Sequence, residues 1–136
     1  MTSGIRGGMM GPGGMKMGKF VIRAVASGVK FDLRAGNGEV IATSEVYDSR
    51  AACHKGVESV RKIAAAGKVD DLTAGEKPMT NPKFEVYEDK RGGFRFRMKS
   101  RNGQIVAVSE GYTTLQACLD GVESVCQNAP DADIEE

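Results

Sequence analysis

The chain has 136 residues, and its 19 basic and 18 acidic side chains give a net charge of +1. That length allows one ordinary domain, or two very small units that share a core. The near balance of charge excludes attraction of nucleic acid or an anionic membrane by the protein as a whole, so such a role needs a local patch.

The three cysteines, Cys53, Cys118 and Cys126, lack CxxC spacing. Their number and spacing predict neither a disulfide framework nor a zinc site, and they favour a reducing compartment. No apolar stretch approaches the roughly 18 residues that a membrane helix needs. We therefore expect a soluble cytoplasmic protein with no membrane contact and no bound metal.

Residues 1–18 are rich in glycine and methionine and lack the continuous apolar centre of a signal peptide. They are interpreted as a disordered leader or an expression remnant, with Met15 and Met17 as alternative natural starts.

From residue 19 onward, the sequence consists of two tandem repeats of one unit. At a constant offset of 65, residues 31–64 and 96–129 share fifteen identical residues. Upstream, Lys19 and Lys83 match at an offset of 64, so the second copy has one extra residue in its first turn. The pattern predicts a first repeat at 19–73, a linker at 74–82 and a second repeat at 83–136, together forming one structural domain.

Each repeat begins with three segments of alternating polar and apolar residues, which is the pattern of half-buried strands. The second and third segments are separated by Asn37-Gly38 in the first repeat and by Asn102-Gly103 in the second. Asn-Gly is the strongest short hairpin signal, because both central residues of a type I′ turn need positive φ. The strands are therefore predicted to form an antiparallel meander.

A helix is predicted after the third strand of each repeat, because small and apolar residues recur there at helical spacing. Asp48 or Ser49 caps the first helix, and Thr113 or Thr114 caps the second. Gly67 and Pro130 end them. A glycine recurs in the middle of each helix, Gly56 and Gly121, at a cost of about 1 kcal/mol relative to alanine, and we expect it to let helix and sheet approach closely.

Three strands and one helix leave an uncovered sheet edge and a thin core, which two copies remedy by pairing. The predicted fold is α+β: two tandem β-β-β-α(-β) repeats form one continuous antiparallel sheet. Two helices pack on one face with pseudo-twofold symmetry. The segments 68–73 and 131–135 are candidates for further edge strands.

The repeated string Asn-Gly-x-x-x-Ala-x-Ser-Glu-x-Tyr, followed by Ala-Cys-x-x-Gly-Val-Glu-Ser-Val, resembles the YegP-like family of small uncharacterised bacterial proteins. The resemblance covers both repeats. It implies β3-α-β units, single in dimers or in tandem, that form one sheet with exchanged C-terminal strands. It therefore favours strands at Val69–Thr73 and Asp133–Glu135. It implies no reaction, cofactor or catalytic residue.

The second strand of the second repeat is unusually basic. It carries Arg95, Arg97 and Lys99 on one face, with Tyr87 expected beside them on the preceding strand. Basic sheet faces with interleaved aromatic residues bind single-stranded nucleic acid in some proteins. An ordinary solvated sheet face has the same pattern, and the first repeat breaks it with Asp32.

The Ser-Glu-x-Tyr element lies where the third strand turns into the helix. Its candidate binding residues are Glu45, Tyr47, Glu110 and Tyr112, which a pseudo-twofold junction would bring together around a small ligand. The alternative is structural: the tyrosine packs its ring on the helix, and the serine satisfies the end of the strand.

The chain presents many structural signals and no catalytic set, so the leading hypothesis is a non-enzymatic interaction module. Its partner is a protein, a peptide or nucleic acid, and we expect no cofactor. The alternatives are a ligand binder or enzyme at the pseudo-twofold junction, and a weak single-strand binder through the basic strand. We expect a monomer, because the tandem repeat replaces a homodimer.

Overall fold

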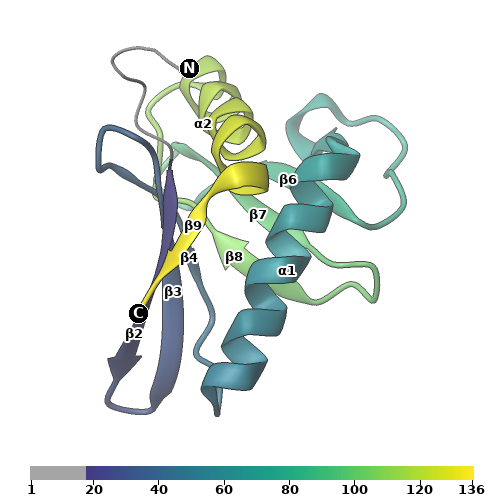
Figure 1. Cartoon of the computed structure of the whole chain (residues 1–136). Helices are drawn as coiled ribbons and strands as arrows, with labels where there is room; N and C mark the ends of the chain where they lie inside the picture. Colours follow the sequence, from purple (N-terminus) through teal and green to yellow (C-terminus); the bar gives the residue numbers. More distant parts are fainter. Residues whose placement is uncertain (1–17) are drawn as a thin grey trace, which may run out of the picture.

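The computed structural model describes residues 18–136, and the expectations for residues 1–17 lie outside that range. The first repeat forms β2 (Lys19–Val25), β3 (Gly28–Arg34), β4 (Val40–Ser44), α1 (Arg50–Ala66) and β5 (Val69–Asp71). The second repeat forms β6 (Lys83–Glu88), β7 (Phe94–Lys99), β8 (Ile105–Val108), α2 (Leu115–Asn128) and β9 (Asp133–Glu135) (Figure 1). A short 3-10 turn at Leu72–Ala74 follows β5, and another at Ala129–Asp131 lies between α2 and β9.

One sheet runs through both repeats, in the order β5-β6-β7-β8-β4-β3-β2-β9. The repeats join at its centre, where β4 pairs antiparallel with β8 and Thr43 lies opposite Val108. The last strand of each repeat pairs with the first strand of the other, β5 with β6 and β9 with β2, so the exchange of C-terminal strands is confirmed.

The two exchanged pairs are parallel, whereas the expected sheet was antiparallel throughout. The physical reason lies in the connections. A tight hairpin makes neighbouring strands antiparallel, but these strands follow a helix, and a long connection permits parallel pairing. The linker after β5 supplies such a connection before β6.

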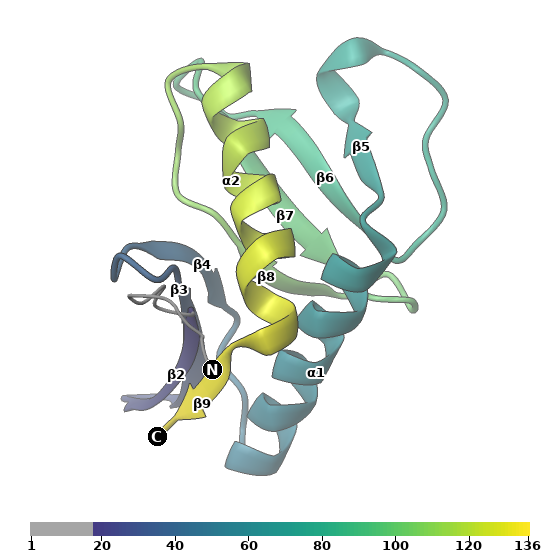
Figure 2. The same ribbon diagram turned by 45° about the horizontal axis from the view of Figure 1, so that its top comes forward.

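Both helices pack on the same face of the sheet (Figure 2). Alternate strand residues point toward them, and the largest are four fully buried phenylalanines, Phe20, Phe31, Phe84 and Phe96. These rings meet edge to face within each repeat, with centroids 5.7 Å and 5.9 Å apart. The core is continuous across the repeats, as expected for units too small to fold alone. No helix within residues 18–136 is long and apolar enough to cross a membrane.

The helix ends follow the predicted signals. Ser49 Oγ accepts a hydrogen bond from Ala52 N at 3.1 Å, and Thr114 caps α2 in the same way, so Ser49 and Thr114 are the caps among the predicted alternatives. Gly67 ends α1 with a left-handed φ of 63°. The second helix stops at Asn128, before Pro130.

The exchanged strand β9 is tied to α1 of the other repeat. Arg61 donates hydrogen bonds to the carbonyls of three residues that precede β9, Ala129, Pro130 and Ala132, at 2.9–3.2 Å. Glu136 accepts a bond from Arg50 at 3.0 Å and lies 3.0 Å from His54 Nε2. These contacts join the end of the second repeat to the first repeat.

Candidate functional site

The tyrosines of the repeated Ser-Glu-x-Tyr element pack against the helices. The Tyr47 ring lies nearly parallel to that of Phe31, at 12° and 6.3 Å, and Tyr112 repeats the arrangement in the second copy. A Cβ atom added to Gly56 would lie 2.7 Å from Tyr47 Cζ and clash with the hydroxyl, so only glycine leaves room for the ring. The predicted close approach of helix and sheet at this glycine is confirmed.

The serines of the same element satisfy the ends of the strands. Ser44 Oγ accepts a hydrogen bond from Phe31 N at 2.9 Å and donates to Glu45 O at 2.7 Å, and Ser109 forms the equivalent pair of bonds. The side chains of Glu45 and Glu110 are exposed. The element therefore has the structural role that was one of its two predicted alternatives.

The structure does not bring Glu45, Tyr47, Glu110 and Tyr112 into one pocket. Ser44 lies opposite Ala107 in the central strand pair, so Glu45 and Glu110 follow the two strands away from the pseudo-twofold centre in opposite directions. They are separated by about four residues of strand, or roughly 13 Å. Tyr47 lines the groove described below, and the other three residues are not part of that lining within residues 18–136.

The basic row of β7 has the predicted members, Arg95, Arg97 and Lys99, with Tyr87 beside it. Carboxylates lie within reach of all three cations. Arg95 Nε is 3.1 Å from Asp89, while Arg97 Nε and Lys99 Nζ are 2.7 Å and 3.5 Å from Glu85. The Arg97 guanidinium also stacks over the Tyr87 ring at 4.7 Å. The row is thus a network of ion pairs, with little positive charge left unpaired.

This row continues into a buried ionic cluster that sequence reasoning missed. Lys83 Nζ lies 2.7 Å from Asp70 and 2.9 Å from Glu85, and each of these three residues is 5% exposed. The linker covers the cluster: Met79 N donates to Asp70, and Met79 O accepts from Lys83. The cross-strand positions of Glu85 and Arg97 were the available signal, because opposite charges face each other there.

The cluster shifts the pKa values of its members. The hydrogen bond from Lys83 holds the pKa of Asp70 below its usual 3.8, against the effect of burial. Burial raises the pKa of Glu85, but bonds from Lys83 and Arg97 outweigh it and leave that pKa below 4.5. The bond to Asp70 raises the pKa of Lys83 above 10.5.

Acid is expected to weaken the fold through these carboxylates. A carboxyl whose pKa is lowered by folding stabilises the protein above its unfolded pKa, and this stabilisation is lost as the pH falls through the folded value. The free energy of unfolding from urea titrations should therefore decline as the pH drops from about 5 to 3. Equal stability at pH 3 and pH 7 would show that the cluster contributes nothing.

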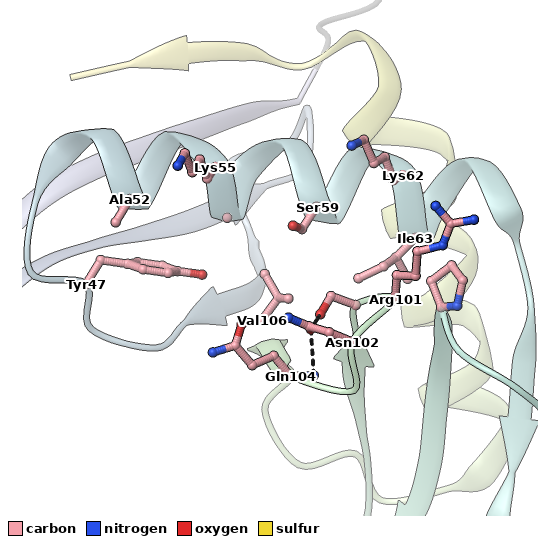
Figure 3. Close-up of a pocket in the computed structure, with 13 residues that line it drawn as sticks. Tyr47, Ala52, Lys55, Ser59, Lys62, Ile63, Arg101, Asn102, Gln104 and Val106 are labelled. Atoms are coloured by element: carbon pink, nitrogen blue, oxygen red, sulfur yellow. Dashed lines mark hydrogen bonds between the residues drawn. The ribbon is translucent and has the colours of Figure 1, made fainter.

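A groove of about 890 Å³ lies between α1 and the hairpin that joins β7 to β8 (Figure 3). The groove therefore joins a helix of the first repeat to a turn of the second. It is lined by Tyr47, Ala52, Lys55, Gly56, Ser59, Lys62, Ile63, Pro82, Ser100, Arg101, Asn102, Gln104 and Val106. Tyr47 stands at one end with its hydroxyl directed along the groove, and Arg101 stands near Ile63 at the other.

Three exposed cations surround the groove. Lys55 and Lys62 lie on α1, and Arg101 lies on the hairpin. Within residues 18–136 none of them forms an ion pair, and the lining includes no carboxylate. Unlike the row on β7, this site keeps its positive charge.

The groove also offers an apolar bottom and free polar groups. Ile63 and Val106, both nearly buried, form its floor. Asn102 Oδ1 accepts a bond from Gln104 N at 3.2 Å, which leaves the Asn102 amide group free to donate. In the described part of the chain, the side chain of Gln104 and the hydroxyl of Tyr47 have no hydrogen-bond partner either. Burial raises the pKa of Tyr47, so its hydroxyl stays protonated and can donate.

The second repeat has an equivalent position beside α2 with different charge. At an offset of 65, Lys55 corresponds to Asp120, Lys62 to Gln127 and Arg101 to Gly36, while Gln104 corresponds to Glu39 and Ile63 to Asn128. Asn128 packs against Gly18, since a Cβ added there would lie 2.7 Å from Asn128 Oδ1. Its amide donates to Ser124 O at 2.8 Å. The groove beside α1 and its counterpart beside α2 therefore have equivalent secondary structure but different charge.

The thiols and the histidine do not form a reactive set. Cys53 and Cys118 are buried, and burial raises the pKa of Cys118 to about 11, so its nucleophilic thiolate is scarce at neutral pH. His54 is partly exposed and contacts Glu136. In the range 18–136, no group of His, Cys, Asp and Glu is arranged to hold a metal ion. The chemistry that the groove supports is binding by charge, hydrogen bonds and apolar contact.

Comparison with known proteins identifies both repeats. The family described as "Domain of unknown function (DUF1508)" matches residues 25–71 and 89–136. A UPF0339 protein of Methanosarcina acetivorans is 56% identical over 52 residues, which are 38% of this chain and 90% of that protein. That relative therefore has the length of one repeat.

Two further relatives span both repeats. A UPF0339 protein of Bordetella pertussis is 37% identical over 115 residues, which cover 85% of this chain and 91% of that protein. The solution structure of yegP from E. coli, titled a protein of unknown function, is 30% identical, with a TM-score of 0.74 over 90% of this chain and 95% of that one. The chain therefore belongs to the YegP-like DUF1508 family and carries two copies of its unit.

Proposed function

We propose that this protein is a binding module that catalyses no reaction, and that the groove along α1 holds an anionic partner. The observation that carries the proposal is the difference in charge between the groove and its pseudo-symmetric counterpart. Three cations that form no ion pair within residues 18–136 surround the groove on α1, whereas the equivalent positions beside α2 carry Asp120 and no cation.

The comparison between the repeats separates folding from function. Both contain the tyrosine, the mid-helix glycine and the Asn-Gly turn, which the repeat needs in order to fold. The equivalent position beside α2 keeps the same fold with Asp120, Gln127 and Gly36 in place of the cations, so the architecture does not require Lys55, Lys62 and Arg101. Like charges gathered in a concave site repel one another and attract an oppositely charged ligand, even when the net charge of the protein is only +1.

The basic row of β7 offers less for the same role. Asp89 and Glu85 already neutralise Arg95 and Arg97, so a nucleic-acid phosphate would have to displace carboxylates that lie 3.1 Å and 2.7 Å away. In the part of the chain that the structure describes, no carboxylate competes for the cations of the groove on α1.

A pair of double variants tests the proposal. Lys55→Asp with Lys62→Gln gives the first groove the residues of the second repeat, and Lys77→Asp with Lys90→Gln makes the same charge change at exposed lysines elsewhere. Binding of hexaglutamate and tripolyphosphate is measured by calorimetry at low salt. We expect the groove variant to lose at least tenfold in affinity, which corresponds to about 1.4 kcal/mol of binding free energy. The control variant should lose less than twofold.

Equal losses in the two variants would show that only net charge matters and would contradict the proposal. If the groove substitutions leave the affinity for both anions unchanged, the proposal is contradicted as well. Circular dichroism of both variants checks that they fold.

The same proposal places the protein in the cytoplasm as a monomer. Its three cysteines are free thiols, as is usual in a reducing compartment. The central β4–β8 pairing joins two units within one chain, where separate units would have to meet as a dimer. Sedimentation velocity at micromolar concentration should give a single species with the mass of one chain.

A further inference from the structure

Building on the proposed function, we infer that the anionic partner is an extended acidic peptide segment, with an aliphatic side chain between its carboxylates, and is not a nucleic acid. The inference rests on the length of the groove, the placement of its cations, its apolar floor and the free hydrogen-bonding groups of its hairpin wall.

The cations on α1 are spaced for an elongated ligand. Lys55, Ser59 and Lys62 follow one another at intervals of four and three residues, so they form a single line along the helix. Seven residues of helix rise about 10.5 Å between the two lysines. An extended peptide advances about 3.3 Å per residue, so carboxylates two to four residues apart can meet both flexible ammonium groups.

The floor of the groove suits an aliphatic side chain. Ile63 and Val106 are 1% and 5% exposed, and they lie between the line of cations and the hairpin. A side chain that covers this floor loses contact with water, which favours binding by about 25 cal/mol for each Å² of apolar surface buried. A ligand made only of charged groups, such as polyphosphate, would leave this surface uncovered.

The hairpin wall provides partners for a peptide backbone. The amide group of Asn102 and the side chain of Gln104 face the groove from the β7–β8 hairpin (Figure 3). An amide side chain can donate and accept at once, as the alternating C=O and N–H groups of an extended peptide require. With Lys55 and Lys62 opposite, the site matches a chain that has polar backbone on one side and carboxylates on the other.

Nucleic acid fits the groove less well. Single strands are held mainly by base stacking on aromatic side chains together with cations along the backbone. Among residues 18–136, Tyr47 is the one aromatic residue in the lining, and Phe31 is stacked near one face of its ring at 6.3 Å. The site therefore has cations and an apolar floor but lacks a stacking platform.

Four probes test the inference against the full chain. The first is a fluorescein-labelled octapeptide with the core Glu-Glu-Leu-Glu-Glu, and the second replaces its leucine with serine. The third is a labelled octathymidylate, and the fourth is unlabelled tripolyphosphate. Affinities of the labelled probes are measured by fluorescence anisotropy, and that of tripolyphosphate by calorimetry. Each is measured on the unmodified protein, on Lys55→Asp/Lys62→Gln and on the control Lys77→Asp/Lys90→Gln.

We expect the leucine peptide to bind most tightly, to lose at least tenfold in the groove variant and to keep its affinity in the control. The serine peptide should bind at least threefold more weakly. If octathymidylate or tripolyphosphate binds in a groove-dependent way and the peptides do not, the peptide inference is wrong while the proposed function stands. If no probe responds to the groove substitutions, both are wrong. A serine peptide as tight as the leucine peptide would overturn the role of the floor.

Discussion

Replacing Lys83 with methionine is expected to lower the free energy of unfolding by about 3–5 kcal/mol, because it leaves the buried Asp70 carboxylate without a cation, while Glu85 keeps Arg97 at 2.7 Å. Lys83 is the only cation that contacts both Asp70 and Glu85 within residues 18–136, and its carboxylate partners are 5% exposed. The substitution also removes the bond that Lys83 donates to Met79 O. Urea unfolding at pH 7, followed by circular dichroism, measures the loss.

The first repeat provides a matched control for this experiment. Lys19 occupies the position of Lys83 and pairs with Glu135 at 3.0 Å, but these side chains are 49% and 57% exposed. Lys19→Met should cost less than about 1 kcal/mol, as exposed ion pairs do. Similar losses for the two lysines would contradict the account, since burial is the difference between them.

A second signature comes from pH. In Lys83→Met the buried Asp70 carboxylate lacks its cation, and its protonation removes the uncompensated charge. The stability gap between the variant and the unmodified protein should therefore narrow as the pH falls toward about 3. A gap that stays constant with pH would assign the loss to packing.

Gly56→Ala is expected to destabilise the protein by about 2 kcal/mol, within the range for overpacked sites. Helix propensity alone predicts the opposite, a gain of about 1 kcal/mol. The new methyl group would clash with the Tyr47 hydroxyl and lie 2.7 Å from its Cζ, so the ring must move. Thermal and urea unfolding decide between the two signs.

Pseudo-symmetry and a double-mutant cycle sharpen this test. A Cβ added to Gly121 would lie 2.8 Å from Tyr112 Cζ, so Gly121→Ala should cost a similar amount. Once Tyr47 is truncated to alanine, adding Gly56→Ala should cost less than it does in the unmodified protein. If the two substitutions change the free energy of unfolding additively, the tyrosine ring does not require the glycine.

The elements that sequence reasoning placed correctly have local causes. The predicted hairpin forms, but Gly38 N donates to Ala35 O, so Gly36 and Asn37 are the central residues of its turn and Gly38 follows at a φ of 88°, in place of the expected type I′ turn centred on Asn37-Gly38. Ser49 caps its own helix and Gly67 ends it, so each of these signals acts within a few residues of chain. The exchanged strands were different: Asp133–Glu135 is short and acidic, so its own pattern is weak. The family resemblance indicated it, and the strand is held mainly by contacts with the other repeat.

The groove and the buried cluster depend on contacts that neither repeat contains alone. Lys55 and Arg101 come together because β4 pairs with β8, and this pairing places the second repeat's hairpin beside the first repeat's helix. Lys83 is buried because the linker folds back over it. The charge difference at the groove is nevertheless visible in the sequence, because Lys55 of the first helix corresponds to Asp120 of the second at an offset of 65.

Chemical-shift mapping with the leucine peptide tests the central claim most directly. The ¹⁵N-labelled protein is titrated, and perturbed amides are located on the structure. We expect them to gather at residues 52–63 of α1 and 100–106 of the hairpin, including the side-chain amides of Asn102 and Gln104, while residues 117–128 of α2 stay unchanged. Perturbations confined to α2, or to Arg95 and Arg97 on β7, would contradict the assignment of the site.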